Sequence, residues 1–176
     1  MRVLVLLCLI FCSSAFAKTI KTGLHIGYNY ANLEARNATS TFSGTGGGIA
    51  GGLAFSFFEE KRFGFRLSSN YSNLNVTGGT KSVIGGAAFN AATLNVNFDL
   101  GPNRHSLGLG FGATFIPNSN FQGGAIVSNT FGGLVIEGKD FWKNGFYDIV
   151  QVFLLRDSST LYQYPFFGIL SIGYEF

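Results

Sequence analysis

The stretch GILSIGYEF, residues 168–176, decides the fold class because its residue types alternate with a period of two. Large apolar residues occupy every second position, and small or polar residues lie between them, which is typical of a β-strand with one apolar and one polar face. The apolar positions are Leu170, Ile172, Tyr174 and Phe176. Such a face needs cover, either from a core formed by the rest of the chain or from lipid.

Seven further segments show the same alternation. The eight expected strands are residues 22–31, 48–58, 63–74, 90–100, 106–116, 125–137, 145–156 and about 164–176. Two of them are irregular: Phe131 and Val135 fall out of phase in 125–137, and residues 145–156 carry apolar side chains in both phases. We therefore expect a β-bulge in one or both of these strands.

The connections alternate between short and long. Residues 59–62 and 101–105 form short connections, and a third begins at 138–140. Longer polar or Gly-rich stretches lie at about 32–47, 77–89, 117–124 and 157–163. Short turns at one end and longer loops at the other indicate an all-β fold, an eight-stranded antiparallel up-and-down barrel with both termini at the short-turn end.

The size of the alternating side chains indicates which face of this barrel is wet. Eight strands enclose little space, so the many Phe and Tyr rings would not fit inside, and an outer face of Gly, Ala, Ser and Asn would carry almost no charge. The reverse arrangement directs the large residues into lipid and leaves small and polar residues in a narrow lumen. Rings also gather at both strand ends, as the two membrane interfaces favour. We therefore expect a transmembrane barrel and not a soluble one.

The first 17 residues have the features of a secretory signal peptide: Arg2, an apolar run from Val3 to Cys12, and a small-x-small ending at Ala17. Both cysteines lie inside this segment, so the expected barrel domain, residues 18–176, has no disulfide. Without Arg2 the chain carries 11 basic and 9 acidic residues, which is too balanced to suggest nucleic-acid binding.

Residues 18–176 resemble the small eight-stranded outer-membrane β-barrel proteins of Gram-negative bacteria. The resemblance is carried by the signal peptide before them, the eight alternating segments and the final strand. Leu170, Ile172, Tyr174 and Phe176 resemble the signal that the barrel-assembly machinery reads in such proteins. The resemblance implies insertion by that machinery and contact with outer-membrane lipid and lipopolysaccharide. It also implies periplasmic termini, and it assigns no catalytic residue.

Four polar residues form a candidate lumen network. By alternation His25, Arg66, Asp99 and Glu175 point inward near the short-turn end. The expected strand pairing brings Arg66 near Asp99 and Glu175 near His25. Because charges in a narrow lumen need partners, we expect a polar plug in the periplasmic half.

Two functional hypotheses follow. The chain is either a closed, monomeric anchor that displays surface loops for membrane integrity, adhesion or surface interaction, or a narrow channel for small solutes. A lipid-modifying enzyme is a weaker alternative, since His105 and Ser106 lack the expected spacing on a lipid-facing strand. The sequence predicts no catalytic site, cofactor or metal.

Overall fold

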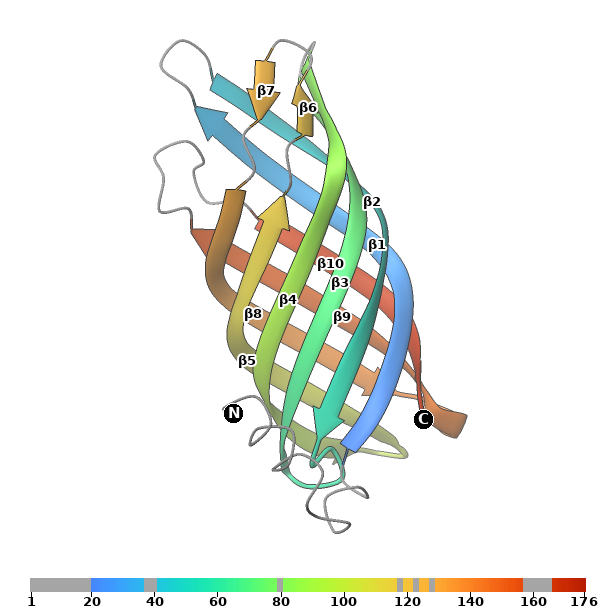
Figure 1. Ribbon diagram of the computed structural model, residues 1–176. Helices are drawn as coiled ribbons and strands as arrows, with labels where there is room; N and C mark the ends of the chain where they lie inside the picture. Colours follow the sequence, from blue (N-terminus) through green and yellow to red (C-terminus); the bar gives the residue numbers. More distant parts are fainter. Residues whose placement is uncertain are drawn as a thin grey trace, which may run out of the picture.

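The computed structural model describes residues 20–36, 41–78, 81–116, 119–121, 124–126, 129–156 and 166–176 (Figure 1). The predicted signal peptide lies outside these residues. The strands are β1 (Ile20–Arg36), β2 (Thr41–Phe57), β3 (Phe63–Gly78), β4 (Lys81–Leu100), β5 (Asn103–Ile116), β6 (Ser119–Phe121), β7 (Gly124–Ile126), β8 (Asn129–Phe141), β9 (Phe146–Arg156) and β10 (Phe166–Glu175). A 3-10 turn, η1 (Lys143–Gly145), joins β8 to β9. No helix in the described ranges has the length and apolar character needed to cross a membrane.

Eight of these strands close into a barrel in which all neighbouring strands are antiparallel. The order β3-β2-β1-β10-β9-β8-β5-β4 is closed by pairing of β3 with β4. The first and last strands pair along their length, from Gly23 opposite Glu175 to Asn32 opposite Phe166. The small β6–β7 hairpin stands outside this ring and pairs with the start of β4 through Val83 and Ile84. The predicted eight-stranded up-and-down barrel is confirmed.

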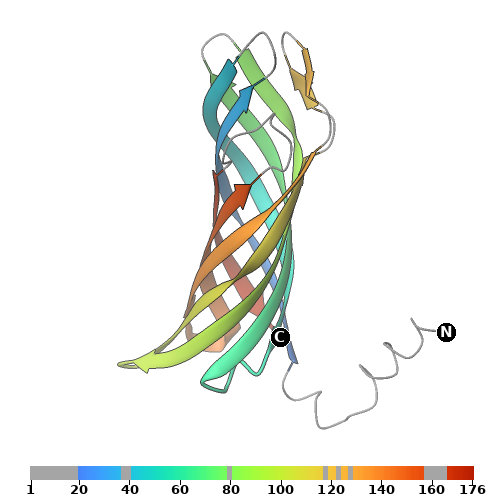
Figure 2. The ribbon, with the colours of Figure 1, turned by 90° about the vertical axis from the view of Figure 1, so that its left-hand side faces the viewer.

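The barrel wall is uneven in height. β1 to β4 have 16 to 20 residues each, whereas β8, β9 and β10 have 13, 11 and 10. At the loop end, β1 extends beyond the last residue of its pairing with β10, and there it pairs only with β2. Figure 2 shows these strands rising above the ends of β9 and β10.

Two expected loops, 32–47 and 77–89, are largely strand in the structure, so their assignment as loops was wrong. Residues 32–36 and 41–47 extend β1 and β2, and residues 77–78 and 81–89 extend β3 and β4. These extensions are rich in Gly, Ser, Thr and Asn. Because the apolar phase that marks a strand in lipid is weak there, the alternation did not reveal them.

Two predictions about β8 and β9 were also wrong. The pairing of β8 with β5 and β9 advances one residue at a time, without a bulge. Phe131 and Val135 are instead fully buried on the lumen face. The third turn does not begin at 138–140, since β8 continues to Phe141 and the turn occupies residues 142–145.

The outward orientation of the large apolar side chains is confirmed. On β1, Leu24, Ile26, Tyr28 and Tyr30 are 46–66% exposed, whereas His25 and Asn29 between them are 6% and 0% exposed. Exposed rings lie near both ends of the wall: Phe63, Phe146, Tyr174 and Phe176 at the short-turn end, and Tyr28, Tyr30, Tyr71 and Phe115 towards the other. The start of β1 and the end of β10 lie together at the short-turn end, where Thr22 and Phe176 exchange two backbone hydrogen bonds of 3.0 and 3.1 Å. A mainly apolar outer band on a barrel closed by antiparallel strand pairing is the structure of a barrel that crosses a membrane.

Candidate functional site

The loop-side half of the lumen is mainly apolar, although it holds the buried hydroxyl of Thr114, in the row between Phe89 and Phe131. Phe89, Phe131, Phe153 and Phe167 are completely buried there, and the Phe89 ring lies 5.5 Å from that of Phe153 and 5.0 Å from that of Phe167. Leucine, valine and alanine side chains from β1, β3 and β4 surround these rings. The expectation of a polar lumen throughout is therefore wrong. Phe131 and Phe153 belong to strands whose apolar residues occupy both phases, so one phase faces lipid and the other fills the barrel. Phe89 lies in the part of β4 that was expected to be a loop.

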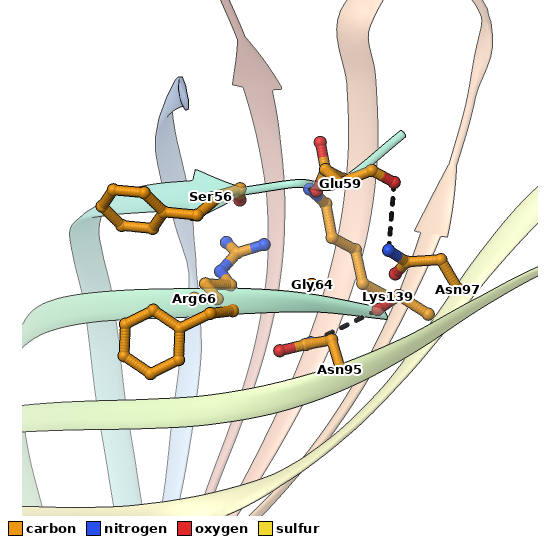
Figure 3. A pocket seen from close by; sticks show the side chains of 10 residues that line it. Ser56, Glu59, Gly64, Arg66, Asn95, Asn97 and Lys139 are labelled. Atoms are coloured by element: carbon orange, nitrogen blue, oxygen red, sulfur yellow. Dashed lines mark hydrogen bonds and ion pairs between the residues drawn. The ribbon is translucent and has the colours of Figure 1, made fainter. Parts of the chain in front are cut away.

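The short-turn half of the lumen is charged, and Lys139 lies at its centre (Figure 3). Its ammonium group donates to Glu59 Oε1 at 2.6 Å and to Glu175, and it lies over the Phe141 and Tyr147 rings. Glu59 lies in the turn between β2 and β3. Its side chain folds back into the barrel and is 8% exposed. The turn is held there because Asn97 donates to the backbone carbonyls of Glu59 and Lys61 at 3.0 and 2.8 Å. A turn residue therefore caps this end of the lumen.

Arg66 extends the charged cluster towards the middle of the barrel. Its guanidinium lies 3.8 Å from Glu137 Oε1 and 4.0 Å from Glu175 Oε1, and it donates to the Tyr147 hydroxyl at 3.4 Å. Arg66 is 2% exposed and Glu137 is fully buried. In such an environment each charge depends on its partner, because neither can be solvated by water.

Amide side chains continue the network across the barrel. Gln151 donates to Glu137 Oε2 at 2.8 Å and accepts from Asn70 at 3.0 Å, and Asn95 donates to Glu137 Oε1 at 3.0 Å. His25 contacts Asn70 through Nε2 and the Tyr147 hydroxyl through Nδ1 at 3.3 Å. These contacts join five strands, β1, β3, β4, β8 and β9, in one polar layer below the phenylalanine cluster.

Two buried cations, Arg66 and Lys139, face three carboxylates, those of Glu59, Glu137 and Glu175. A third cation, the partly exposed Lys21, lies 3.7 Å from Glu59 Oε2, so cations and carboxylates are equal in number. Burial and the neighbouring carboxyl of Glu175 raise the pKa of Glu59, although Lys139 partly opposes this shift. The raised pKa of Glu59 therefore reflects mainly the burial of its carboxyl group and not a surplus of negative charge.

The structure places three of the four predicted network residues in the lumen. His25, Arg66 and Glu175 are buried there, whereas Asp99 is exposed next to the turn between β4 and β5. The inclusion of Asp99 was wrong because alternation stops controlling burial where the strand leaves the barrel. The expected contact between Arg66 and Asp99 was wrong, because Arg66 is opposite Thr93 and Asp99 is opposite Arg104. Glu175 is opposite Gly23, one inward position from His25 on the neighbouring strand, as expected from the closure of the last strand on the first.

Three central members of the cluster were missed in the sequence. Lys139 and Glu59 were both assigned to short turns, whereas Lys139 lies in β8 and only Glu59 lies in a turn. Glu137 follows Ile136, an outward residue, so alternation alone indicates that Glu137 faces the lumen. Extending the same alternation by two residues would have placed Lys139 beside it.

The His105–Ser106 pair does not form a catalytic dyad. His105 Nδ1 lies 2.5 Å from Asp140 Oδ1 on the outer wall, whereas Ser106 is buried on the lumen side and accepts from Asn95. Adjacent strand residues point to opposite faces, so the two side chains cannot meet one substrate. In the described part of the chain, no three His, Cys, Asp or Glu residues are grouped as metal ligands.

The charged layer encloses very little space. The cavity lined by Ser56, Glu59, Arg66, Asn95 and Lys139, among others, has a volume of about 10 Å³. That volume is close to the minimum that one water molecule needs. Arg66, Lys139 and the phenylalanine cluster above them therefore obstruct the described lumen at two successive levels.

Comparison with solved structures identifies the fold. The outer-membrane protein OprG from Pseudomonas aeruginosa superposes with a TM-score of 0.61 at 13% identity, over 90% of this chain and 96% of OprG. The chain has the fold of a small outer-membrane β-barrel. Two weaker similarities are Ail, the attachment invasion locus protein of Yersinia pestis (TM-score 0.45, 16% identity, 89% and 98% of the two chains), and Neisserial surface protein A (0.47, 13%, 86% and 95%). No protein-family model and no curated protein sequence matches the chain.

Proposed function

We propose that this chain is a closed, non-conducting barrel of the bacterial outer membrane that anchors and displays the segments at its loop end. The observation that carries the proposal is the double obstruction of the lumen by buried phenylalanine rings and by the Arg66–Lys139 charge cluster. An eight-stranded barrel is narrow enough for its own side chains to fill it. A channel for small solutes is less well supported, because buried side chains occupy the described lumen at two levels and the cavity at the charged level has a volume of only about 10 Å³.

The orientation and assembly belong to the same proposal. Both described ends of the chain lie with the short turns, which by analogy with outer-membrane barrels face the periplasm. The outward residues Leu170, Ile172, Tyr174 and Phe176 are 44–68% exposed and so remain accessible to the assembly machinery until β10 pairs with β1. Lipopolysaccharide would surround the loop-end wall, and a surface partner would bind through the displayed segments.

Planar-bilayer recording tests the closed lumen. We expect no steady conductance from the wild type, and we expect water and ions to enter only when both obstructions are removed, as in Phe89→Ala/Phe153→Ala/Lys139→Ala. The matched control, Phe111→Ala/Phe115→Ala/Lys143→Ala, removes the same residue types from exposed positions and should stay silent. A steady wild-type conductance would overturn the proposal.

The display role needs a separate measurement in cells. Shortening the two longer connections, from β5 to β8 and from β9 to β10, should abolish any surface binding while leaving the barrel folded and the membrane intact. Loss of membrane integrity with these shortened variants would instead indicate that the displayed segments, and not only the barrel, maintain the membrane.

A further inference from the structure

Two depressions lie one above the other on the outer wall along β3. The lower has a volume of about 610 Å³ and is lined by outward residues of β2 to β5, including Leu53, Phe55, Leu67 and Phe111. The upper has a volume of about 600 Å³ and lies between Gly47–Ile49 of β2, Asn73 and Asn75 of β3, and Gly85–Gly86 of β4. Both are large enough to hold part of a small ligand.

The lower depression carries polar groups where the wall should be apolar. Ser69 and Asn90 are both exposed, are paired across β3 and β4, and line its floor. Among the described residues neither side chain has a hydrogen-bond partner. An unpartnered amide in hydrocarbon is costly, so a partner for Asn90 has to come from the lipid phase.

Strand register fixes the depth of these two residues. Three outward rows cross β3, β4 and β5. From the loop end they are Tyr71–Ala88–Phe115, then Ser69–Asn90–Ala113, then Leu67–Ala92–Phe111. The first row contains two rings of the loop-side girdle, which marks the membrane interface. Asn90 and Ser69 belong to the next outward-facing row, which lies closer to the middle of the membrane. The ester, amide or hydroxyl groups at the head end of acyl chains would lie at this level.

The upper depression lies on the water side of that girdle and has a different lining. Asn73 and Asn75 are exposed, and the glycines beside them leave the wall without side chains. The Tyr71 hydroxyl lies over Gly86, only 2.1 Å from where a β-carbon would be. The ladder between β2 and β3 is interrupted here, since pairing stops at Gly47–Asn75 and resumes at Ala50–Ser72.

We infer that the two depressions bind one glycolipid of the loop-side leaflet, with its acyl chain in the lower depression and its sugar in the upper one. Asn90 and Ser69 bond the polar group at the head end of the acyl chain, and Asn73 and Asn75 bond sugar hydroxyls beside the Tyr71 ring. None of the described residues that line either depression is charged, which favours an uncharged sugar over a phosphate, whose usual partners are Arg and Lys. The inference rests on the membrane barrel of the proposed function, but not on its closed lumen or its displayed segments.

Native mass spectrometry of the refolded barrel tests this site. The barrel is released from micelles doped with galactosyl diacylglycerol or with phosphatidylcholine carrying the same acyl chains. We expect the wild type to retain one galactolipid in preference to phosphatidylcholine. Asn73→Ala/Asn75→Ala should lose this preference by about tenfold, as expected from the loss of one or two hydrogen bonds.

A second variant separates the two halves of the site. Ser69→Ala/Asn90→Ala should weaken retention of both lipids, because both carry the acyl ester. Asn32→Ala removes an exposed amide of β1 outside both depressions and is the matched control. Heat-dependent migration on gels confirms that each variant is folded.

Three results would overturn the inference: equal retention of the two lipids by the wild type, unchanged preference in the Asn73/Asn75 variant, or unchanged retention in the Ser69/Asn90 variant. A lipid-free dimer would also overturn it, because a second copy would then cover this wall. Each of these results leaves the conductance test of the closed lumen unaffected.

Discussion

Lys139 Nζ lies 2.6 Å from Glu59 Oε1, although the two residues are 80 positions apart in the sequence. One belongs to the last part of β8 and the other to the turn between β2 and β3. The contact crosses the barrel, so the turn covers the short-turn end of the lumen and Lys139 of β8 holds it in place. The stability of the barrel should therefore depend on this pair.

Lys139→Met should destabilise the barrel by about 3–5 kcal/mol, because it leaves the buried carboxylates of Glu59 and Glu175 without their common cation. Denaturant unfolding in lipid vesicles, followed by the fluorescence of Trp142, the only tryptophan, measures this loss. Lys143→Met, at an exposed position in the adjacent turn, should change the free energy of unfolding by less than about 0.5 kcal/mol. Equal losses in the two variants would contradict a central role for Lys139.

Phe89→Ala should cost about 3–5 kcal/mol, because it opens a cavity among the rings of Phe153 and Phe167. Phe111→Ala removes the same ring from a lipid-facing position that is 73% exposed, where acyl chains can fill the space. Its cost should be clearly smaller in the same unfolding assay. A larger loss for Phe111 than for Phe89 would argue against a tightly packed upper lumen.

Ile26→Arg and Leu100→Arg compare two side chains of similar exposure, 66% and 69%, at different depths. Ile26 lies mid-wall on β1, so its substitution should lower the free energy of unfolding by about 2–4 kcal/mol. Leu100 lies at the end of β4, and its substitution should lower the free energy of unfolding by about 0–1 kcal/mol. Folding into vesicles at a series of denaturant concentrations gives both values. In a water-soluble barrel the two variants would behave alike.

The raised pKa of Glu59 makes a prediction about pH. Because the folded chain holds this proton more tightly than the unfolded chain, the associated stability is present at low pH and is lost as the pH rises through the raised pKa. Glu59→Gln keeps an uncharged side chain at every pH. The free energy of unfolding of this variant should therefore improve relative to the wild type between pH 4 and pH 8.

Glu60→Gln is the matched control for the pH series, since Glu60 is the neighbouring carboxylate and its side chain is 72% exposed. If the stability difference between Glu59→Gln and the wild type were the same at both ends of the pH range, Glu59 would be titrating normally in the folded barrel.

The sequence predicts the architecture better than the contents of the barrel. Alternation along β1 and β10 is strong because lipid selects large apolar residues on one face, so strand number and outward face could be read directly. Alternation does not tell a lumen filled with phenylalanine from a bulged strand, which is why Phe131 and Val135 were misinterpreted. Pairing partners also depend on register, and a shift of a few residues separates Arg66 from Asp99.

Because the wall is uneven in height, the barrel has a high side, formed by β1 to β4, and a low side, formed by β8 to β10. On the high side, the residues beyond the girdle belong to hydrogen-bonded strands, whereas β9 and β10 end much sooner. Antibodies raised against the folded barrel should therefore include a class that recognises rigid strand surface on the high side. Such antibodies would tolerate sequence changes in the connecting segments, because their epitope would lie on the strands themselves.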